Sequence, residues 1–292
     1  MSQKTKGLLV NLLLYAAAFA VGAIPFALID DLLLAEAAFT GAATLVIFLV
    51  TCFVPDTSLY DPYWSVAPPV MLLFAMVKYR LWSVNAILFF AAVCLWAIRL
   101  TGNWALTYKG LCREDWRYRQ FREKCSPLGF FFINLCGLQF VPTIVVYLGL
   151  VGGFGVLRAE GFDPLILIGL AVMLTGVWLE LISDRAIHRF LREHAGEGRT
   201  CDASIWRLSR HPNYLGELTF WLGVFLVYLF AGVGKWYLGL GFLSIWILFF
   251  TVSIPMMERH NLARREDYAA YRARTSVLIP LPPKKEREDR DE

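Results

Sequence analysis

Charged residues are scarce in this chain. Asp, Glu, Lys and Arg make up 18% of its 292 residues, whereas hydrophobic residues make up 58% and the mean hydropathy is +0.53. Such a composition excludes an ordinary water-soluble protein. It indicates an integral membrane protein that is built from apolar helices.

Familiar cofactor, metal and disulfide motifs are also missing. The six cysteines form no C-x-x-C pair and several lie in or beside apolar runs, so neither a disulfide framework nor a zinc site is expected. No G-x-G-x-x-G follows a strand and no Walker sequence occurs, so a nucleotide would be held without a glycine-rich loop. The chain has no internal repeat, which favours a single helical bundle.

Long apolar runs are what the sequence does contain. A helix that crosses a bilayer needs about 20 apolar residues. The runs predict an all-α, polytopic membrane bundle of about seven or eight helices. The third run is the least regular, because Pro68 and Pro69 interrupt it. The expected spans are residues 8–28, 37–54, 63–78, 81–100, 128–152, 163–182, 217–233 and 236–256.

The distribution of Lys and Arg predicts the orientation, since cytoplasmic loops collect them. They gather in loops 101–127 and 183–216 and after Met257. With eight spans these segments share one side with the N-terminus, so both termini are expected in the cytoplasm. Lys78 and Arg80 depart from this pattern. A cleaved signal peptide is the alternative for the N-terminal run, which is longer than a usual signal core.

A polar, cation-rich stretch at residues 206–217 leads directly into an apolar run. Its centre is a proline, Pro212, that can open a helix. Cations before a helix start and polar groups on its first turns predict a binding site for phosphate, ribose or carboxylate at the membrane edge. The candidate binding residues here are Arg207, Arg210, His211, Asn213, Tyr214 and Glu217.

A second cluster has the four-residue spacing of one helical face: Glu180, Asp184, His188 and Arg192. Acid and base pairs at this spacing also occur on exposed helix faces, where they only stabilise the helix. A carboxylate at the membrane boundary, as expected for Glu180, is costly unless it faces a partner or a polar cavity. We therefore count Glu180, Asp184 and His188 as candidate site residues.

Two further clusters complete the set. Arg99 and Asn103 lie one helical turn apart and can point inward together, although a snorkelling arginine would look the same. After the last span, two tyrosines three residues apart share a helical face that can cover a flat ring or anchor a surface helix. The candidates in this region are Glu258, Arg259, Tyr268 and Tyr271.

All four clusters are expected on one side of the membrane. A cationic opening with carboxylates and aromatics, leading into an apolar bundle, suits a large anionic nucleotide cofactor and a lipophilic substrate. The expected partners are a lipophilic small molecule and membrane lipids, and neither nucleic acid nor a metal.

The motif of residues 207–217 resembles a known membrane domain. It reads Arg207-x-x-Arg210-His211-Pro212-Asn213-Tyr214-x-Gly216-Glu217. Together with Glu180, Asp184 and the C-terminal tyrosines, it is similar to the DUF1295 proteins and to the C-terminal domain of steroid 5-alpha-reductases, over about residues 55–282. Residues 1–54 lie outside the resemblance, and residues 283–292 are expected to form a solvated charged tail.

The resemblance implies an NADPH-dependent reductase that reduces a carbon–carbon double bond, of the enone type, in a lipophilic molecule. Asn213 and Glu217 match the cofactor-contacting Asn-x-x-Gly-Glu segment of that family. Asp184 matches the aspartate of its Ser-Asp pair, Arg99 an arginine near the cofactor, and Tyr268 the tyrosine of its C-terminal Asp-Tyr pair. The chain departs from steroid reductases at Trp96, where they have a tyrosine, and at Glu180, where they have an asparagine.

The acid of such a reaction would come from residues 60–64, which resemble the Asp-x-x-Trp segment of DUF1295 proteins. Asp61 and Tyr63 are the candidate catalytic residues. The alternative is a turn built by Asp-Pro with interfacial aromatics.

Two other function classes stay open. Isoprenylcysteine and phospholipid methyltransferases also carry Arg-His-Pro-x-Tyr-x-Gly before a membrane span, and they bind S-adenosylmethionine. A transporter or a non-enzymatic membrane protein is the third reading, although the middles of the spans hold few ionisable residues. The short loops and the DUF1295 resemblance favour a bacterial inner membrane as the location.

Overall fold

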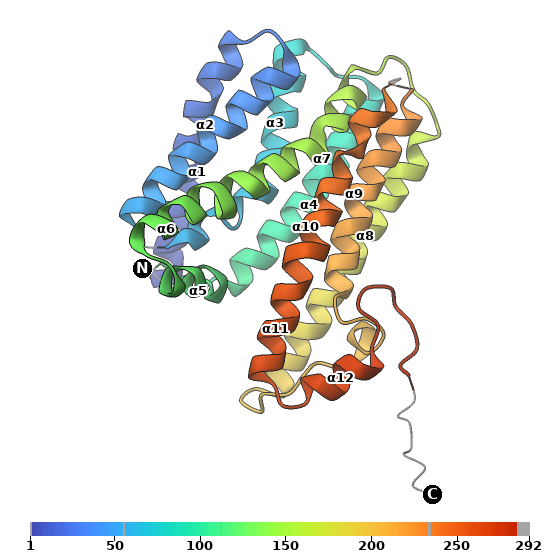
Figure 1. Ribbon diagram of the computed structural model, residues 1–292. Helices are drawn as coiled ribbons and strands as arrows, with labels where there is room; N and C mark the ends of the chain where they lie inside the picture. The colour runs from blue at the N-terminus through green and yellow to red at the C-terminus, as the bar shows by residue number, and fades with distance from the viewer. Residues whose placement is uncertain (1, 55, 112, 233–234, 285–292) are drawn as a thin grey trace, which may run out of the picture. The chain divides into compact units, whose positions relative to one another are not determined.

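The computed structural model describes residues 2–54, 56–111, 113–232 and 235–284. Within these ranges all regular secondary structure is helical, apart from one isolated bridge between Ser209 and Ser276, which confirms the all-α prediction (Figure 1). Most of the expected charged tail lies outside the described residues. The free cysteines among the described residues are Cys52, Cys94, Cys125, Cys136 and Cys201, and Cys112 lies outside them.

Seven helical stretches of the described chain are long and apolar enough to cross a membrane, so the protein is an integral, multi-pass membrane protein. They are Gln3–Leu28, Leu32–Phe53, Val84–Thr107, Pro127–Arg158, Ile166–Glu193, Pro212–Phe230 and Trp236–Arg264. The third expected span is helix α3 (Tyr63–Tyr79), which continues through Pro68 and Pro69. With 17 residues it reaches only about 26 Å, slightly less than the thickness of the hydrocarbon core.

The chain divides into two compact units. Unit 1 comprises Met1–Leu170 and Val224–Phe242, and unit 2 comprises Ala171–Gly223 and Leu243–Glu292. Helices α8 (Ile166–Glu193) and α9 (Pro212–Phe230) contribute residues to both units. Of the candidate site residues, Asp61, Tyr63, Arg99 and Asn103 belong to unit 1, and all the others belong to unit 2.

Unit 1 contains the first seven α-helices. Besides α3 they are α1 (Gln3–Leu28), α2 (Leu32–Phe53), α4 (Val84–Thr107), α5 (Trp116–Lys124), α6 (Pro127–Phe132) and α7 (Val141–Arg158). Side-chain caps fix several helix starts, as where Asp31 accepts the backbone N–H of Leu34 and Ser83 that of Ala86. Rings of α1, α2 and α3 fill part of the core, including Phe39, which is fully buried between them.

A π-helical segment, Ile133–Phe140, joins α6 to α7. It carries two buried amides five residues apart, and Gln139 Nε2 donates to Asn134 Oδ1 at 3.0 Å. Both amides also donate to Thr51 Oγ1. In an α-helix, side chains five residues apart diverge, whereas the wider π turn brings them onto one face. The π segment therefore allows these amides to satisfy one another inside an apolar helix.

Unit 2 consists of most of α8, the first part of α9 and the C-terminal helices. These are α10 (Phe242–Leu248), the π segment Phe249–Ser253, α11 (Ile254–Arg264) and α12 (Tyr268–Arg274), and the short 3₁₀ helix Ser204–Arg207 precedes α9. α9 begins at Pro212, as the sequence predicts, because a proline has no N–H to lose at a helix start.

Candidate functional site

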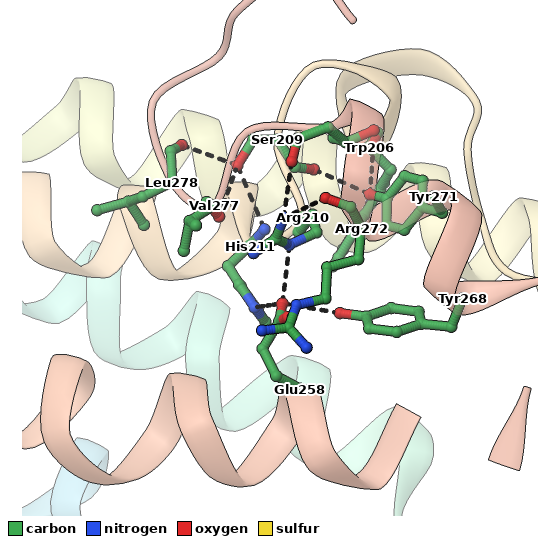
Figure 2. A network of polar contacts seen from close by, with 11 residues as sticks. Trp206, Ser209, Arg210, His211, Glu258, Tyr268, Tyr271, Arg272, Val277 and Leu278 are labelled. Atoms are coloured by element: carbon green, nitrogen blue, oxygen red, sulfur yellow. Dashed lines mark hydrogen bonds and ion pairs between the residues drawn. The ribbon is translucent and has the colours of Figure 1, made fainter. Parts of the chain in front are cut away.

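A buried carboxylate, that of Glu258 on α11, forms the centre of a polar network in unit 2 (Figure 2). Its Oε1 accepts hydrogen bonds from Arg210 Nε at 2.9 Å and from the Tyr268 hydroxyl at 2.8 Å. His211 Nε2 lies 2.9 Å from the same oxygen, and Arg272 Nε lies 3.2 Å from Oε2. Two arginines, a histidine and a phenol thus converge on one carboxylate.

Arg210 also ties the start of α9 to the segment after α12. Its Nη1 donates to the carbonyls of Arg272 and Thr275, both at 2.8 Å, and its backbone N–H donates to Ser276 at 2.9 Å. The side chain is 8% exposed. These internal bonds show that Arg210 acts as a structural connector, whatever else it contacts.

The same loop is fixed at several more points. Ser209 Oγ donates to the carbonyl of Leu278 at 2.8 Å, and the hydroxyl of Tyr271 donates to the carbonyl of Trp206 at 2.5 Å (Figure 2). Trp206 in turn donates its indole N–H to the carbonyl of Ser183 on α8 at 2.9 Å. Burial raises the pKa of Tyr271, so this phenol stays a donor at neutral pH. The loop before α9 is therefore held rigidly.

Helices α8 and α9 pack closely as an antiparallel pair. A Cβ on Gly176 would lie 2.5 Å from the backbone nitrogen of Phe220, and a Cβ on Gly216 would lie 2.5 Å from Glu180 Cγ. Gly176 thus faces Phe220, and Glu180 faces Gly216. The residue number rises along α8 while it falls along α9, so the two helices run antiparallel. One turn further, this register puts Asp184 opposite Pro212, the residue before Asn213. The pairing thus packs the turns of α8 that carry Glu180 and Asp184 against the turns of α9 that carry Asn213 and Glu217.

Aromatic contacts order the first turns of α9. The ring of His211 stacks on that of Tyr214 with centroids 5.2 Å apart and planes 9° apart, and Tyr214 meets Phe249 edge-on at 5.0 Å. Glu217 accepts the indole N–H of Trp221, one turn later, at 2.8 Å.

Burial divides the candidate residues of unit 2 into two groups. The buried ones are Glu180, Arg210, His211, Glu217, Glu258, Tyr268 and Tyr271. The others keep exposed surface, and they are Asp184, His188, Arg207, Asn213, Tyr214 and Arg259. The second group keeps surface through which it is able to contact a ligand.

In unit 1, Asp61 lies just before α3 in a polar cluster. Its carboxylate accepts the hydroxyl of Tyr118 on α5, and Arg117 Nη2 lies 3.9 Å away. Burial raises the pKa of Asp61 to about 7, against the opposite effects of Arg117 and Tyr118. Tyr63 is buried, and its hydroxyl lies 3.0 Å from that of Thr40. Asp61 and Tyr63 thus have separate surroundings.

Arg99 and Asn103 lie one turn apart on α4, in unit 1, and both are partly buried. Within the described ranges no group of His, Cys, Asp and Glu is arranged to hold a metal ion. Several participating residues were absent from the predicted set, among them Tyr118 and Arg272. Arg272 follows Tyr268 by one helical turn, and this spacing was the available signal.

Comparison with known proteins gives one family. The family described as "Protein of unknown function (DUF1295)" matches residues 47–275, which is more than half of the chain. No curated protein and no solved structure matches the chain. The resemblance to steroid 5-alpha-reductases therefore stays a prediction.

Proposed function

The chain belongs to the DUF1295 family, and we propose that it is a membrane reductase that uses NADPH to reduce a carbon–carbon double bond, of the enone type, in a lipophilic substrate. The function of the family is unknown, so the proposal rests on the resemblance of the sequence motifs and on the polar groups of unit 2.

The observation that carries the proposal is the antiparallel pairing of α8 and α9. Gly216 and Gly176 allow the backbones to approach. Continued by one turn, the same register puts Asp184 opposite Pro212 at the start of α9, next to Asn213. A carboxylate suits the ribose hydroxyls of a dinucleotide, and an amide suits its carboxamide or phosphate. The guanidinium of Arg207, which is exposed, suits a phosphate. These residue types fit NADPH.

The network around Glu258 has a positioning role in this proposal. It holds His211 at 2.9 Å, and the stacked ring of Tyr214 is thereby ordered. An ordered aromatic face can support a flat ring of the cofactor. When bound, NADPH would supply a hydride, and the protein would supply position and a proton.

Asp61 is the better of the two candidate proton donors. An acid whose pKa lies near the working pH donates and recovers a proton most efficiently, and burial raises the pKa of Asp61 to about 7. The hydroxyl of Tyr63 is buried against Thr40, which makes it the weaker candidate.

A methyltransferase that uses S-adenosylmethionine is the second candidate. The carboxylates of Glu180 and Asp184, one turn apart on α8, would also suit the cationic sulfonium of that cofactor. A ribose is common to both cofactors, so the carboxylates alone do not decide between them.

Thermal stabilisation of the purified protein separates the candidates, because a ligand that binds only the folded state raises its stability. We expect NADPH to raise the unfolding temperature and S-adenosylmethionine to leave it unchanged. Asp184→Asn and Asn213→Leu should each weaken NADPH binding about tenfold, the equivalent of about 1.4 kcal/mol. Glu193→Gln removes an exposed charge from the same helix and is the matched control.

Stabilisation by S-adenosylmethionine alone would overturn the reductase proposal in favour of the second candidate. A positive NADPH result leads to an activity test, in which loss of the NADPH absorbance should require an added lipophilic enone. Asp61→Asn should then lower the rate while NADPH binding is preserved.

We also propose that both termini face the cytoplasm of a bacterial inner membrane. This orientation requires α3 to cross the membrane as an eighth span, because seven spans put the termini on opposite sides. Reporter fusions at Lys4 and after Leu281 decide the question. Opposite sides for the two reporters would mean that α3 does not cross.

A further inference from the structure

A basic cavity lies in unit 2 where the last turn of α8, the following loop and the last turns of α11 meet. Its volume is about 380 Å³. The polar side chains that line it are His194, Arg199, His260, Asn261, Arg264 and Arg265. None of its lining residues, all of which lie in the described part of the chain, is a carboxylate.

The local structure explains how the cations come together. His260 and Arg264 are one turn apart on α11, and Arg264 Nη1 lies 3.3 Å from His260 Nε2. The loop after α8 turns back through Gly196 and Gly198, whose φ angles of +90° and +69° suit glycine. This loop brings Arg199 to the cavity.

Two carboxylates close to the cavity in the sequence have partners of their own. Asp267 accepts two hydrogen bonds from Thr200, from the backbone N–H at 2.8 Å and from Oγ1 at 2.5 Å, and this contact anchors the end of the loop. Glu197 pairs with Arg199 at 3.6 Å, but both side chains are about half exposed, so the pair is weak. The side chains that line the cavity therefore carry the charge of three arginines and no carboxylate.

We propose that this cavity binds a phosphate group carried by a small molecule or by a lipid headgroup. A guanidinium presents paired N–H groups that match two phosphate oxygens, and three arginines line this one cavity. The volume falls in the range of small-molecule sites, so the phosphate would be one part of a larger ligand. The inference does not require a reductase, because it concerns only the charge and shape of the cavity.

Titration of the purified full chain with inorganic pyrophosphate at low ionic strength tests the proposal, because salt screens such contacts. We expect the double substitution Arg264→Gln and Arg265→Gln to raise the dissociation constant at least about tenfold. The control is Arg189→Gln, which removes an exposed arginine of α8 outside the cavity. It should change the dissociation constant for pyrophosphate by less than about twofold.

The double variant should unfold at the same temperature as the original protein when no ligand is present, since Arg264 is exposed and Arg265 is only half-buried. If it does not, the single variant Arg199→Gln gives the same comparison from the loop. Equal dissociation constants for all variants, or no binding of pyrophosphate by the original protein, would overturn the proposal.

Competition experiments identify the source of the phosphate. Displacement of pyrophosphate by NADPH but not by NADH would assign the cavity to the extra phosphate of the nucleotide. Displacement by phosphatidylglycerol nanodiscs, but not by phosphatidylcholine nanodiscs, would assign it to a lipid headgroup. Pyrophosphate binding at the cavity without NADPH binding would support this inference and defeat the reductase proposal.

Discussion

Two buried polar clusters, one in each unit, consist of different kinds of side chain. In unit 1 the cluster around Thr143 links neutral groups, because Thr143 Oγ1 lies 2.9 Å from the hydroxyl of Thr44 and 2.8 Å from that of Tyr60. In unit 2 the buried centre is ionic, with Arg210 and Glu258 in contact. Neutral groups are cheap to bury in apolar helices, whereas a buried charge needs its partner. A single substitution should therefore do more damage in the ionic cluster around Glu258 than in the neutral cluster around Thr143.

The largest effect is expected for Glu258→Ala. It leaves Arg210, His211 and Tyr268 without the carboxylate on which they converge, and should lower the free energy of unfolding by about 3–5 kcal/mol. Arg272→Gln is the matched control, because Arg272 contacts the same carboxylate but is 51% exposed, and it should cost less than about 1 kcal/mol. Unfolding in denaturant measures both. Similar losses would mean that burial does not set the strength of this network.

The second prediction concerns Asp61, a buried carboxyl group of unit 1, and the pH dependence of stability that it causes. Because burial raises its pKa to about 7, the folded protein holds this proton more tightly than the unfolded chain does. Its contribution to stability is present below about pH 4 and is lost as the pH rises towards 7. A shift of this size corresponds to at most about 4 kcal/mol.

Asp61→Asn should remove this pH dependence, which unfolding at pH 5 and pH 8 would detect. Glu160→Gln neutralises an exposed carboxyl of the same unit and should preserve the dependence. An unchanged pH profile in Asp61→Asn would show that Asp61 is ionised throughout.

The contact of α8 with α9 gives the third prediction. In Gly216→Ala, the new Cβ would lie 2.5 Å from Glu180 Cγ and 2.8 Å from the backbone oxygen of Gly176, so the helices must separate. A loss of about 1–3 kcal/mol in unfolding free energy is expected. Gly102→Ala in α4 meets nothing within 4 Å and should be neutral or stabilising by up to about 1 kcal/mol. A harmless Gly216→Ala would contradict the close approach.

The smallest effect is expected for a neutral contact of unit 1. Thr143→Val removes one hydroxyl that Thr44 and Tyr60 share, at a cost of about 1 kcal/mol. Thr175→Val, which removes an exposed hydroxyl of α8, should change stability by less than about 0.5 kcal/mol. If Thr143→Val cost as much as Glu258→Ala, the distinction between neutral and ionic burial would fail.

Much of the helical layout was predictable, because a helix that crosses a membrane needs a long apolar run and such runs are visible in the sequence. The start of α9 at Pro212 was predicted from backbone chemistry alone. The first two helices begin about five residues before the expected spans, because Ser2 and Asp31 cap them and polar residues can join a helix at its end. The π segment was not predictable, because it depends on a packing arrangement that no residue pattern specifies.

The candidate site was predictable as a set of residue types but not as a set of roles. The repeated spacing on α8 correctly put Glu180 and Asp184 on one helix, but their pairing with the first turns of α9 depends on Gly176 and Gly216. The basic cavity was missed, because its arginines come from the loop after α8 and from the end of α11, which are distant in the sequence.

The sequence by itself determined the membrane class, most of the helices and the positions of the polar clusters, since hydropathy and helix-start chemistry act locally. Only the tertiary structure decided what each polar group does. From the sequence, Arg210 is predicted to bind an anionic ligand. In the structure its N–H groups donate instead to Glu258, 48 residues away, and to the carbonyl of Thr275, 65 residues away. The energy of a buried charge depends on the partner that folding brings to it, and no local pattern contains that partner.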